Sequence, residues 1–474
     1  MDSITILQTL LRWALPALAG GAAALLALWA AYRLFFRGRR PLTRLQAVSL
    51  GLLCVWLSLV VCLTSLSRGA NFAGQYNFHL LSGYINAWNH WSLRELQLIL
   101  FNMLMFAPLG FLLPLAWPKA RRFWVTAAAS LAVTGGIEFF QFVTGTGIFE
   151  LDDLLHNLIG SLFGYFCIMA VLSAVREKAL RPGPVARVLL IPGLIGLGLG
   201  AAFYLYARQP YGNLPIRPAS PQDMSAVRVV TADWAPATQT GTAAVYRSRH
   251  TADKAYRQQI QDSFAALEGL TVSQTDRRDG ETRVCTGTNA QGTAFQMDFF
   301  VRTGEWSYTT FADTAAQLTQ DEIRQRRTRY EDWMRENGLL PENAVFSVQN
   351  GDTLRWDAQP SADPAAGQAD FQQGSVMIQF DEAGAVTAFY YQIAWNVWTA
   401  ESPILSERQA FAQVQDGNFS QYIPFQPGET LHVTGCTLDY VWDTKGFYQP
   451  VYTFSGYRSS PEDLWVCQIP ALAA

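Results

Sequence analysis

The stretch Glu138–Tyr165, EFFQFVTGTGIFELDDLLHNLIGSLFGY, places polar and ionisable side chains inside otherwise apolar sequence. Its pattern predicts the end of one membrane helix, a short polar turn and the start of the next helix. The polar residues within or beside the apolar runs are Glu138, Gln141, Asp153, His156 and Asn157. Because ionisable groups at membrane depth are costly, they usually face the interior of a helix bundle or a wet cavity. This stretch is therefore the first candidate for a functional site.

Six apolar segments in the first 206 residues each have close to the roughly 20 residues that a bilayer-spanning helix needs. They run approximately over residues 14–36, 45–67, 96–117, 123–143, 153–175 and 188–206. The first segment is not a cleaved signal peptide, because it is too long and its positive charges follow the apolar run. The sequence thus predicts an all-α membrane bundle of six transmembrane helices over residues 1–206.

The loops between these spans alternate in their content of Lys and Arg. The loops after spans one, three and five hold Arg37, Arg39, Arg40, Arg44, Lys119, Arg121, Arg122, Arg176, Lys178, Arg181 and Arg187. The other loops hold only Arg68 and Arg94. Because an excess of Lys and Arg marks the cytoplasmic side, we expect a multi-pass protein of the cell membrane. Its N-terminus and everything after span six are then extracytoplasmic.

The two parts of the chain differ in charge. Residues 1–206 hold 15 Lys and Arg against 7 Asp and Glu, a formal charge of +8, whereas residues 207–474 carry −11. An acidic second part argues against a nucleic-acid partner, which requires a basic face. No spacing resembles a zinc site, and we expect neither a metal nor a cofactor. Cys436 and Cys467 lie on strands predicted to be neighbours, which leaves a disulfide open.

Three of the predicted helices carry polar side chains at the same expected depth. Asn102 lies about six residues into the third span, which is roughly 9 Å at 1.5 Å per residue. Glu138 is similarly far from the outer end of the fourth span, and Gln141 shares its helix face. In the fifth span, Asn157 follows Asp153 one turn deeper. We expect these five residues, called the polar site below, to meet in the outer leaflet.

The fifth span also carries a packing pattern. Asp153, Asn157, Gly160 and Gly164 step by four, three and four residues and therefore share one face of the helix. Small residues on that face allow a neighbouring membrane helix to approach closely. In the third span, Pro108 and Pro114 should kink the helix, which is tolerated where protein or a cavity satisfies the freed carbonyl groups.

Each polar residue also has a structural interpretation. Asn102, Gln141 and Asn157 could serve only as hydrogen-bonding groups between helices. Glu150 and Asp152 precede a helix start, where carboxylates favour the dipole and cap free N–H groups. His156 fits a neutral packing histidine. Glu138 is the hardest to interpret in this way, because a carboxyl group inside a span needs a partner, and the nearest cationic candidate is Arg94.

The combined motifs resemble the VanZ-like family of bacterial membrane proteins over about residues 45–175. They are Asn102…Pro108-Leu109-Gly110, Glu138-x-x-Gln141 and Asp153-x-x-x-Asn157-x-x-Gly160-x-x-x-Gly164-Tyr165. The family takes its name from a protein that gives low-level resistance to the glycopeptide teicoplanin. The resemblance therefore implies a role in glycopeptide resistance or in cell-wall and lipid homeostasis. Many members have an arginine in the turn before the aspartate, where this chain has Gly147, so the balance of charge differs here.

The second part of the chain has the pattern of a soluble α+β ectodomain. Residues 207–242 are rich in Pro, Ala, Ser and Thr and predict a tether with little structure. Residues 243–474 alternate helix and strand signals, and two lobes that divide near residue 340 are one option. The predicted helices begin at the capping boxes Thr319-x-x-Glu322 and Ser406-x-x-Gln409. The last 70 residues weakly resemble PepSY-type domains and extracytoplasmic regulators of a cell-wall kinase, which are binding modules.

Three hypotheses for function follow. In the first, which we favour, a non-enzymatic envelope protein holds a membrane lipid or a lipid-linked wall precursor in the polar site, and its ectodomain binds an envelope partner. In the second, a membrane enzyme uses Glu138 and Asp153 as acid and base on such a precursor. No nucleophile or phosphate-binding cluster accompanies these carboxylates, so we assign no catalytic residue. In the third, the polar residues only join helices, and function resides in the ectodomain.

Overall fold

The computed structural model describes residues 3–36, 42–66, 72, 74–231, 234–279, 282–310, 318–341, 343–359 and 369–473. The chain divides into two compact units. The membrane unit consists of residues 1–87 and 92–209, and the second unit consists of residues 88–91 and 210–474. Arg37, Arg39, Arg40 and Arg68, on which part of the orientation argument rests, lie outside the described residues.

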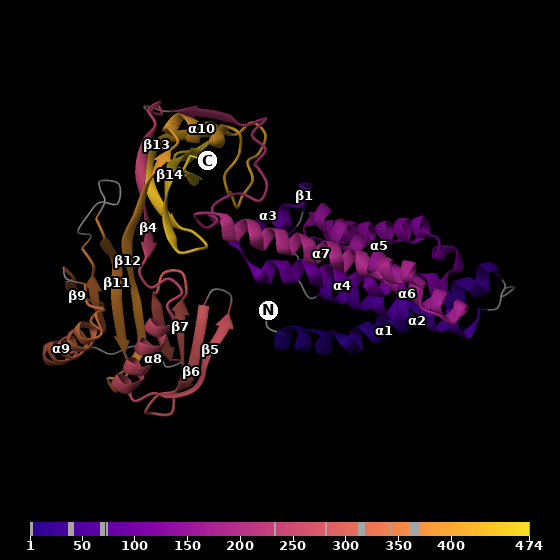
Figure 1. Ribbon diagram of the computed structural model, residues 1–474, viewed down its shortest axis with the longest axis horizontal. Coiled ribbons are helices and arrows are strands. Elements are labelled where there is room, and N and C mark those ends of the chain that lie inside the picture. The colour runs from indigo at the N-terminus through magenta and orange to yellow at the C-terminus, as the bar shows by residue number, and fades with distance from the viewer. Residues whose placement is uncertain are drawn as a thin grey trace. The chain divides into compact units, whose positions relative to one another are not determined.

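The membrane unit is helical (Figure 1). Its elements are α1 (Ser3–Phe36), α2 (Arg44–Val61), the π-helix η1 (Cys62–Leu66), α3 (Ser82–His90), α4 (Leu93–Ala116), η2 (Pro118–Arg121), α5 (Phe123–Thr144), α6 (Leu151–Glu177) and α7 (Pro182–Arg208). Within the described residues, six helices are long and apolar enough to cross a membrane, namely α1, α2, α4, α5, α6 and α7. The predicted six-helix membrane bundle is therefore confirmed. The short helix α3 was not predicted from the sequence.

Local signals explain where several of these helices begin and end. A capping box formed by Thr43 and Gln46 begins α2, and the Ser92 side chain accepts a hydrogen bond from Glu95 N at the beginning of α4. Gly145 ends α5 in the left-handed conformation, with φ 68°. The turn that follows is held by a short parallel pairing of β1 (Tyr76–Asn77) with β2 (Phe149–Glu150).

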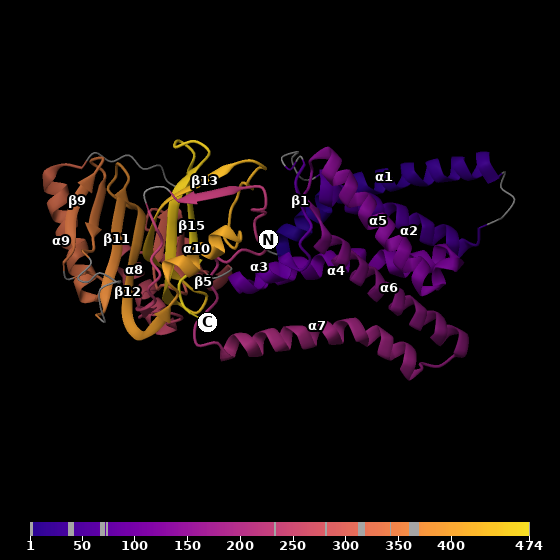
Figure 2. The same cartoon turned by 90° about the horizontal axis from the view of Figure 1, so that it is seen from above.

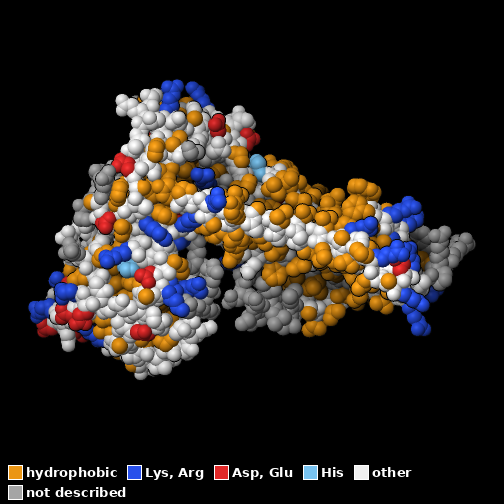
Figure 3. Space-filling model, in the orientation of Figure 1, with side chains coloured by type: hydrophobic (Ala, Val, Ile, Leu, Met, Phe, Trp, Pro, Cys, Tyr) orange, Lys and Arg blue, Asp and Glu red, His pale blue; other side chains and the backbone are white. Residues whose placement is uncertain are grey.

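Helix α7 differs from the other membrane helices. It lies apart from them along most of its length and approaches α6 near the turn that joins the two, and none of its residues is buried (Figure 2). The space-filling view shows hydrophobic side chains over the length of the membrane unit (Figure 3). Lys and Arg side chains gather at the end where α6 is followed by α7. An apolar belt with a basic end is the surface expected of a protein in a bilayer.

The second unit is built on one mixed, mainly antiparallel sheet. Its strands are β3 (Arg228–Thr231), β4 (Gly241–Ser248), β5 (Thr271–Asp279), β6 (Thr282–Thr288), β7 (Ala294–Phe300), β8 (Trp306–Thr310), β9 (Val345–Gln349), β10 (Thr353–Asp357), β11 (Phe371–Phe380), β12 (Val386–Ile404), β13 (Thr430–Trp442), β14 (Phe447–Arg458) and β15 (Leu464–Pro470). Its helices are α8 (Lys254–Glu268), α9 (Gln320–Glu336) and α10 (Glu407–Gln415). The α+β class is confirmed, and both predicted capping boxes are present.

Two hydrophobic cores share this sheet through the long strand β12 (Figure 1). The first half of β12 pairs with β11 and β8, and the second half pairs with β4 from Asn396 onwards. One core contains side chains of α8 and α9, and the other contains side chains of α10. A division near residue 340 does not separate them, because α9 and β9, which flank that residue, pack into the same core.

The described part of residues 210–242 is ordered against the second unit and is not a tether. Strand β3 pairs in parallel with β13, Gly212 N donates to Asp443 Oδ2 at 2.5 Å, and the Trp234 ring packs 5.7 Å from that of Phe411. Composition was misleading here, because backbone hydrogen bonds and one packed tryptophan fix the segment.

Cys436 and Cys467 do not form the disulfide that the sequence left open. Both are free thiols. Cys436 on β13 and Cys467 on β15 each pair with Phe454 of β14, so an entire strand separates them. The prediction that their strands are neighbours was wrong.

Candidate functional site

The polar site is positioned by a close contact between α4 and α6. A Cβ atom built on Gly160 would lie 1.7 Å from Met103 O, and one on Gly164 would lie 1.9 Å from Ala107 O. From the other side, a Cβ on Gly110 would lie 1.7 Å from Ser161 O. These three glycines therefore let the two backbones touch.

Prolines leave unused backbone acceptors in α4. Pro108 has no N–H to donate to the carbonyl group one turn earlier. The Trp56 ring of α2 lies beside this break, and its Nε1 donates to Met105 O at 2.8 Å. The carbonyl group that Pro108 frees is that of Leu104, so the bond to Met105 O joins α2 to α4 beside the break without replacing the lost bond.

The α4–α6 contact joins two members of the polar site directly. Asn102 Nδ2 donates to Asp153 Oδ1 at 2.9 Å, across the two helices. The Asp153 side chain retains 28% of its exposure, so one edge of this pair can meet a molecule from outside the bundle. Arg94, the candidate partner of Glu138, is exposed in the first turn of α4.

The adjacent carboxylate, Asp152, has a different role. It is 3% exposed and accepts hydrogen bonds from Leu81 N at 2.5 Å, Gly83 N at 2.8 Å and Ser82 Oγ at 3.2 Å. It therefore caps the beginning of α3, a helix about 70 residues earlier in the chain. The sequence indicated a capping function for Asp152, but it pointed to the wrong helix.

His156 and Asn157 are buried next to the bonded pair Asn102–Asp153, and some of their polar atoms lack hydrogen-bond partners among the described residues. His156 is 2% exposed and Asn157 is 4% exposed. Neither ring nitrogen of His156, nor Oδ1 of Asn157, has a hydrogen-bond partner among the described residues. His156 Nδ1 lies 3.9 Å from Asp153 Oδ1, and its ring meets the Tyr84 ring edge to face at 5.2 Å. Burial of polar atoms without partners costs on the order of 1–3 kcal/mol each.

A polar stripe follows one face of α5. Its buried members are Thr126, Ser130, Thr134, Glu138 and Gln141. They are spaced by four or three residues, so they face the same side of the helix. Ser130 Oγ lies 2.6 Å from Ser161 Oγ of α6, and Thr134 Oγ1 has no hydrogen-bond partner in the described part of the chain. From the sequence only Glu138 and Gln141 were expected on this face, although Thr126, Ser130 and Thr134 recur at the same four-residue spacing.

Gln141 lies against the turn that contains Gly147. A Cβ on Gly147 would be 2.8 Å from Gln141 Oε1, and the Gln141 carbonyl accepts from Thr146 N at 3.0 Å. An arginine at position 147 would have to displace the Gln141 side chain. The lack of a side chain at Gly147 therefore leaves the space that the inward-pointing Gln141 side chain occupies.

The structure thus bonds Asn102 to Asp153 and buries Glu138, Gln141 and Asn157 within the bundle. Amide, carboxylate and imidazole groups at this position can donate hydrogen bonds to a polar ligand or accept them from it. No group of three or more His, Cys, Asp or Glu side chains could hold a metal ion among the described residues. The chemistry that the site offers is hydrogen-bonding recognition.

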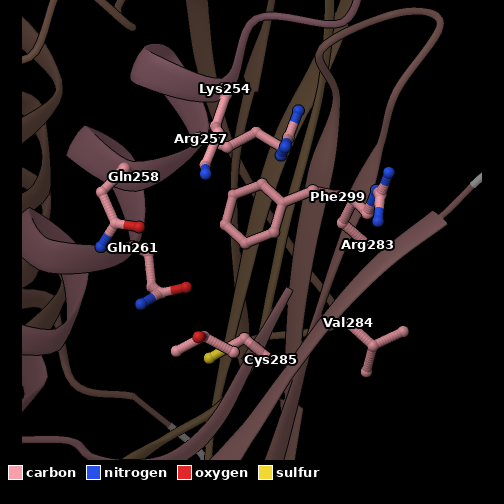
Figure 4. A pocket seen from close by; sticks show the side chains of 9 residues that line it. Lys254, Arg257, Gln258, Gln261, Arg283, Val284, Cys285 and Phe299 are labelled. Atoms are coloured by element: carbon pink, nitrogen blue, oxygen red, sulfur yellow. The ribbon is translucent and has the colours of Figure 1, made fainter. Parts of the chain in front are cut away.

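The second unit contains a small basic cavity of about 120 Å³ (Figure 4). Lys254 and Arg257 of α8 and Arg283 of β6 line it, and Gln261 points toward it. Gln261 is 8% exposed, and its side chain makes no hydrogen bond with a described residue. Burial raises the pKa of the Cys285 thiol in this cavity to about 11, so the thiol is protonated and unreactive at neutral pH.

Part of the membrane unit matches the sequence model of a known family. Residues 22–173 match the sequence model of the VanZ/LLP1 family, which confirms the resemblance seen in the motifs and extends it into α1. No curated protein matches the chain.

Two solved structures are similar to parts of the chain. An uncharacterized protein from Eubacterium rectale ATCC 33656 shares 8% identity over 52% of this chain and 87% of its own, with a TM-score of 0.22. The C-terminal domain of YpeB from Bacillus megaterium shares 13% identity over 48% of this chain and 100% of its own, with a TM-score of 0.19. With scores this low, neither likeness supports a structural or functional conclusion.

Proposed function

We propose that this VanZ-like membrane protein is a non-enzymatic binding protein of the bacterial envelope. Its polar site holds the head group of a membrane lipid or of a lipid-linked wall precursor. The match of residues 22–173 to the VanZ/LLP1 family supports a membrane protein of this kind. The orientation that the Lys and Arg pattern predicts puts the site in the outer leaflet, where wall precursors are used.

One observation carries the proposal. The two ring nitrogens of His156 and Oδ1 of Asn157 are buried beside the bonded pair Asn102–Asp153 and have no hydrogen-bond partner in the described part of the chain. Polar groups that only join helices would be paired with each other, as Ser130 and Ser161 are. Groups left unpaired at the edge of an apolar bundle are instead available to a ligand that supplies hydroxyl or amide groups.

Glycopeptide resistance is the biological role that this binding would serve. A protein that holds a lipid-linked precursor changes how much of it teicoplanin-type antibiotics can reach. We therefore expect expression of the chain to lower the susceptibility of a sensitive bacterial host.

The test compares variants in that host, with the abundance of the protein measured alongside. Asp153→Asn and Glu138→Gln are expected to abolish the resistance at unchanged abundance, because each removes a carboxylate of the polar site. Ser130→Ala, in the paired part of the α5 stripe, is the matched control and should retain resistance. Full resistance of both carboxylate variants at normal abundance would contradict the proposal. A changed lipid or precursor product in the wild type would instead favour the enzyme hypothesis.

The second unit would bind an envelope partner through its basic cavity. Lys254, Arg257 and Arg283 favour an acidic group, and the unpaired amide of Gln261 can donate to it. Lys254→Gln in the full chain should weaken its retention on purified cell-wall material, while Lys445→Gln, outside the cavity, should not. Equal retention of both variants would exclude this cavity as the binding site.

A further inference from the structure

A second cavity lies at the opposite end of the membrane unit from the polar site. It has a volume of about 720 Å³ and is formed where η2 leads into α5 and where α6 turns into α7. Three arginines from three different elements line it, Arg121 from η2, Arg176 from α6 and Arg187 from α7. This is the end at which Lys and Arg side chains gather on the surface (Figure 3).

The wall of the cavity is aromatic and apolar. The rings of Phe123 and Phe166 stack with centroids 6.2 Å apart, and the Tyr165 ring lies 6.1 Å from Phe123. Tyr165 donates its hydroxyl hydrogen to Arg121 O at 2.8 Å, which fixes the backbone of that arginine to α6. Further side chains of α6, including Met169 and Leu172, continue the apolar surface toward α7.

The positive charge of this cavity is incompletely balanced. Arg176 pairs with Glu177 at 2.9 Å, and Glu177 also pairs with Arg181. Arg121 Nε has a neutral carbonyl acceptor, Pro114 O, at 3.4 Å, and Arg187 makes no ion pair with a described residue. One carboxylate thus faces several cations, and an anion that enters the cavity gains the attraction of at least two arginines.

We propose that this cavity binds an anionic phospholipid, with its phosphate between Arg121 and Arg187 and its acyl chains along α6 and α7. Basic pockets between membrane helices on the cytoplasmic side are known to hold such head groups. The absence of any buried residue in α7 leaves its inner face open to acyl chains. A free phosphate ion would satisfy the arginines but would leave the aromatic wall uncovered. This site is independent of the proposed outer-leaflet function.

The experiment uses the full chain in nanodiscs that contain phosphatidylglycerol, phosphatidylcholine or both, followed by mild extraction and native mass spectrometry of the lipids retained. We expect preferential retention of phosphatidylglycerol. The double variant Arg121→Gln/Arg187→Gln should reduce this preference at least tenfold, because each arginine contributes a factor of about five. Arg122→Gln, in the same turn but outside the cavity, is the matched control and should keep the preference.

A second variant separates the lipid from its phosphate. Ala170→Trp narrows the apolar wall without touching an arginine, and we expect it to lower lipid retention while the helical circular dichroism stays unchanged. Equal retention of both lipids by the wild type would overturn the proposal, as would equal loss in the Arg122 variant and the double variant. Competition by inorganic phosphate at a concentration similar to that of the lipid would identify a phosphate site and overturn the lipid assignment.

Discussion

Two buried polar sites, one in each unit of this protein, differ in how fully their hydrogen-bonding capacity is used. In the second unit, Asp443 is 0% exposed and accepts four hydrogen bonds, from Gly212 N, Lys445 N, Phe447 N and Gln449 Nε2, at 2.5–2.9 Å. In the membrane unit, His156 and Asn157 are almost as deeply buried, yet three of their polar atoms have no hydrogen bond to any residue that the structure describes. A carboxylate whose acceptor positions are all used has no capacity left for a ligand, whereas His156 and Asn157 have such capacity.

The comparison teaches that burial alone does not distinguish a structural polar residue from a functional one. Saturation of its hydrogen bonds marks a carboxylate as structural, whereas an unpaired buried atom is a candidate that needs a separate test. By this criterion Asp443 and Asp152 are structural, and the polar site with His156 is available for binding. The predictions below test this distinction.

The largest effect is expected at the close contact that supports the polar site. Gly160→Leu places a side chain where the Met103 carbonyl lies 1.7 Å from the Cβ position, so α4 and α6 must separate. We expect the folded protein to be lost, as measured by abundance in the membrane and by size-exclusion chromatography. Gly135→Leu, whose Cβ would meet nothing within 4 Å, is the control. Normal abundance of the Gly160 variant would contradict the contact.

Removal of the Asp443 carboxylate, whose acceptor positions are all used, should lower the stability less than Gly160→Leu does, but still substantially. Asp443→Ala leaves four donors without their acceptor, and we expect a loss of about 3 kcal/mol in the free energy of unfolding. Thermal unfolding of the full chain, followed by tryptophan fluorescence, measures it. Asp439→Ala, at an exposed position on β13 four residues before Asp443, should change stability by no more than about 0.5 kcal/mol. Similar stabilities of the two variants would remove the basis for calling Asp443 structural.

The adjacent residues Asp152 and Asp153 allow a carboxylate with a structural role and one in the polar site to be compared within one helix turn. Asp152→Asn keeps an acceptor but turns an N–H group toward the donors at the beginning of α3, and should cost about 1 kcal/mol. Asp153→Asn should cost less, because Asn102 can still donate to it. Denaturation in detergent would show the difference. A larger loss for Asp153 would reverse the assigned roles.

The smallest effect is expected at Gly147. Gly147→Ala must move the Gln141 amide oxygen, at 2.8 Å from the new Cβ, and shift the Gln141 Cβ, at 3.3 Å, only slightly, so we expect a change within about 1 kcal/mol and normal abundance. If Gln141 contributes to ligand binding, resistance should fall more than stability does. A fall in stability without any change in resistance would show that Gln141 only packs the turn.

Much of this organisation could be predicted from the sequence, because hydropathy and capping patterns are local. The six spans, the helix starts at Thr319 and Ser406, and the packing stripe with Gly160 needed no knowledge of distant contacts. Strand order is a non-local property, so the separation of Cys436 from Cys467 by β14 could not be predicted from local sequence patterns. The capping of α3 by Asp152 joins segments about 70 residues apart, and no local pattern contains that contact.

The central claim is that a head group uses both ring nitrogens of His156 and Oδ1 of Asn157, which have no hydrogen-bond partner among the described residues. Native mass spectrometry of the full chain with a lipid-linked wall precursor tests it most directly, with His156→Phe compared to the wild type. Phenylalanine fills a similar volume and removes two unpaired nitrogens, so we predict equal or greater stability together with loss of precursor binding. Unchanged precursor binding by this variant, or no binding by the wild type, would contradict the claim.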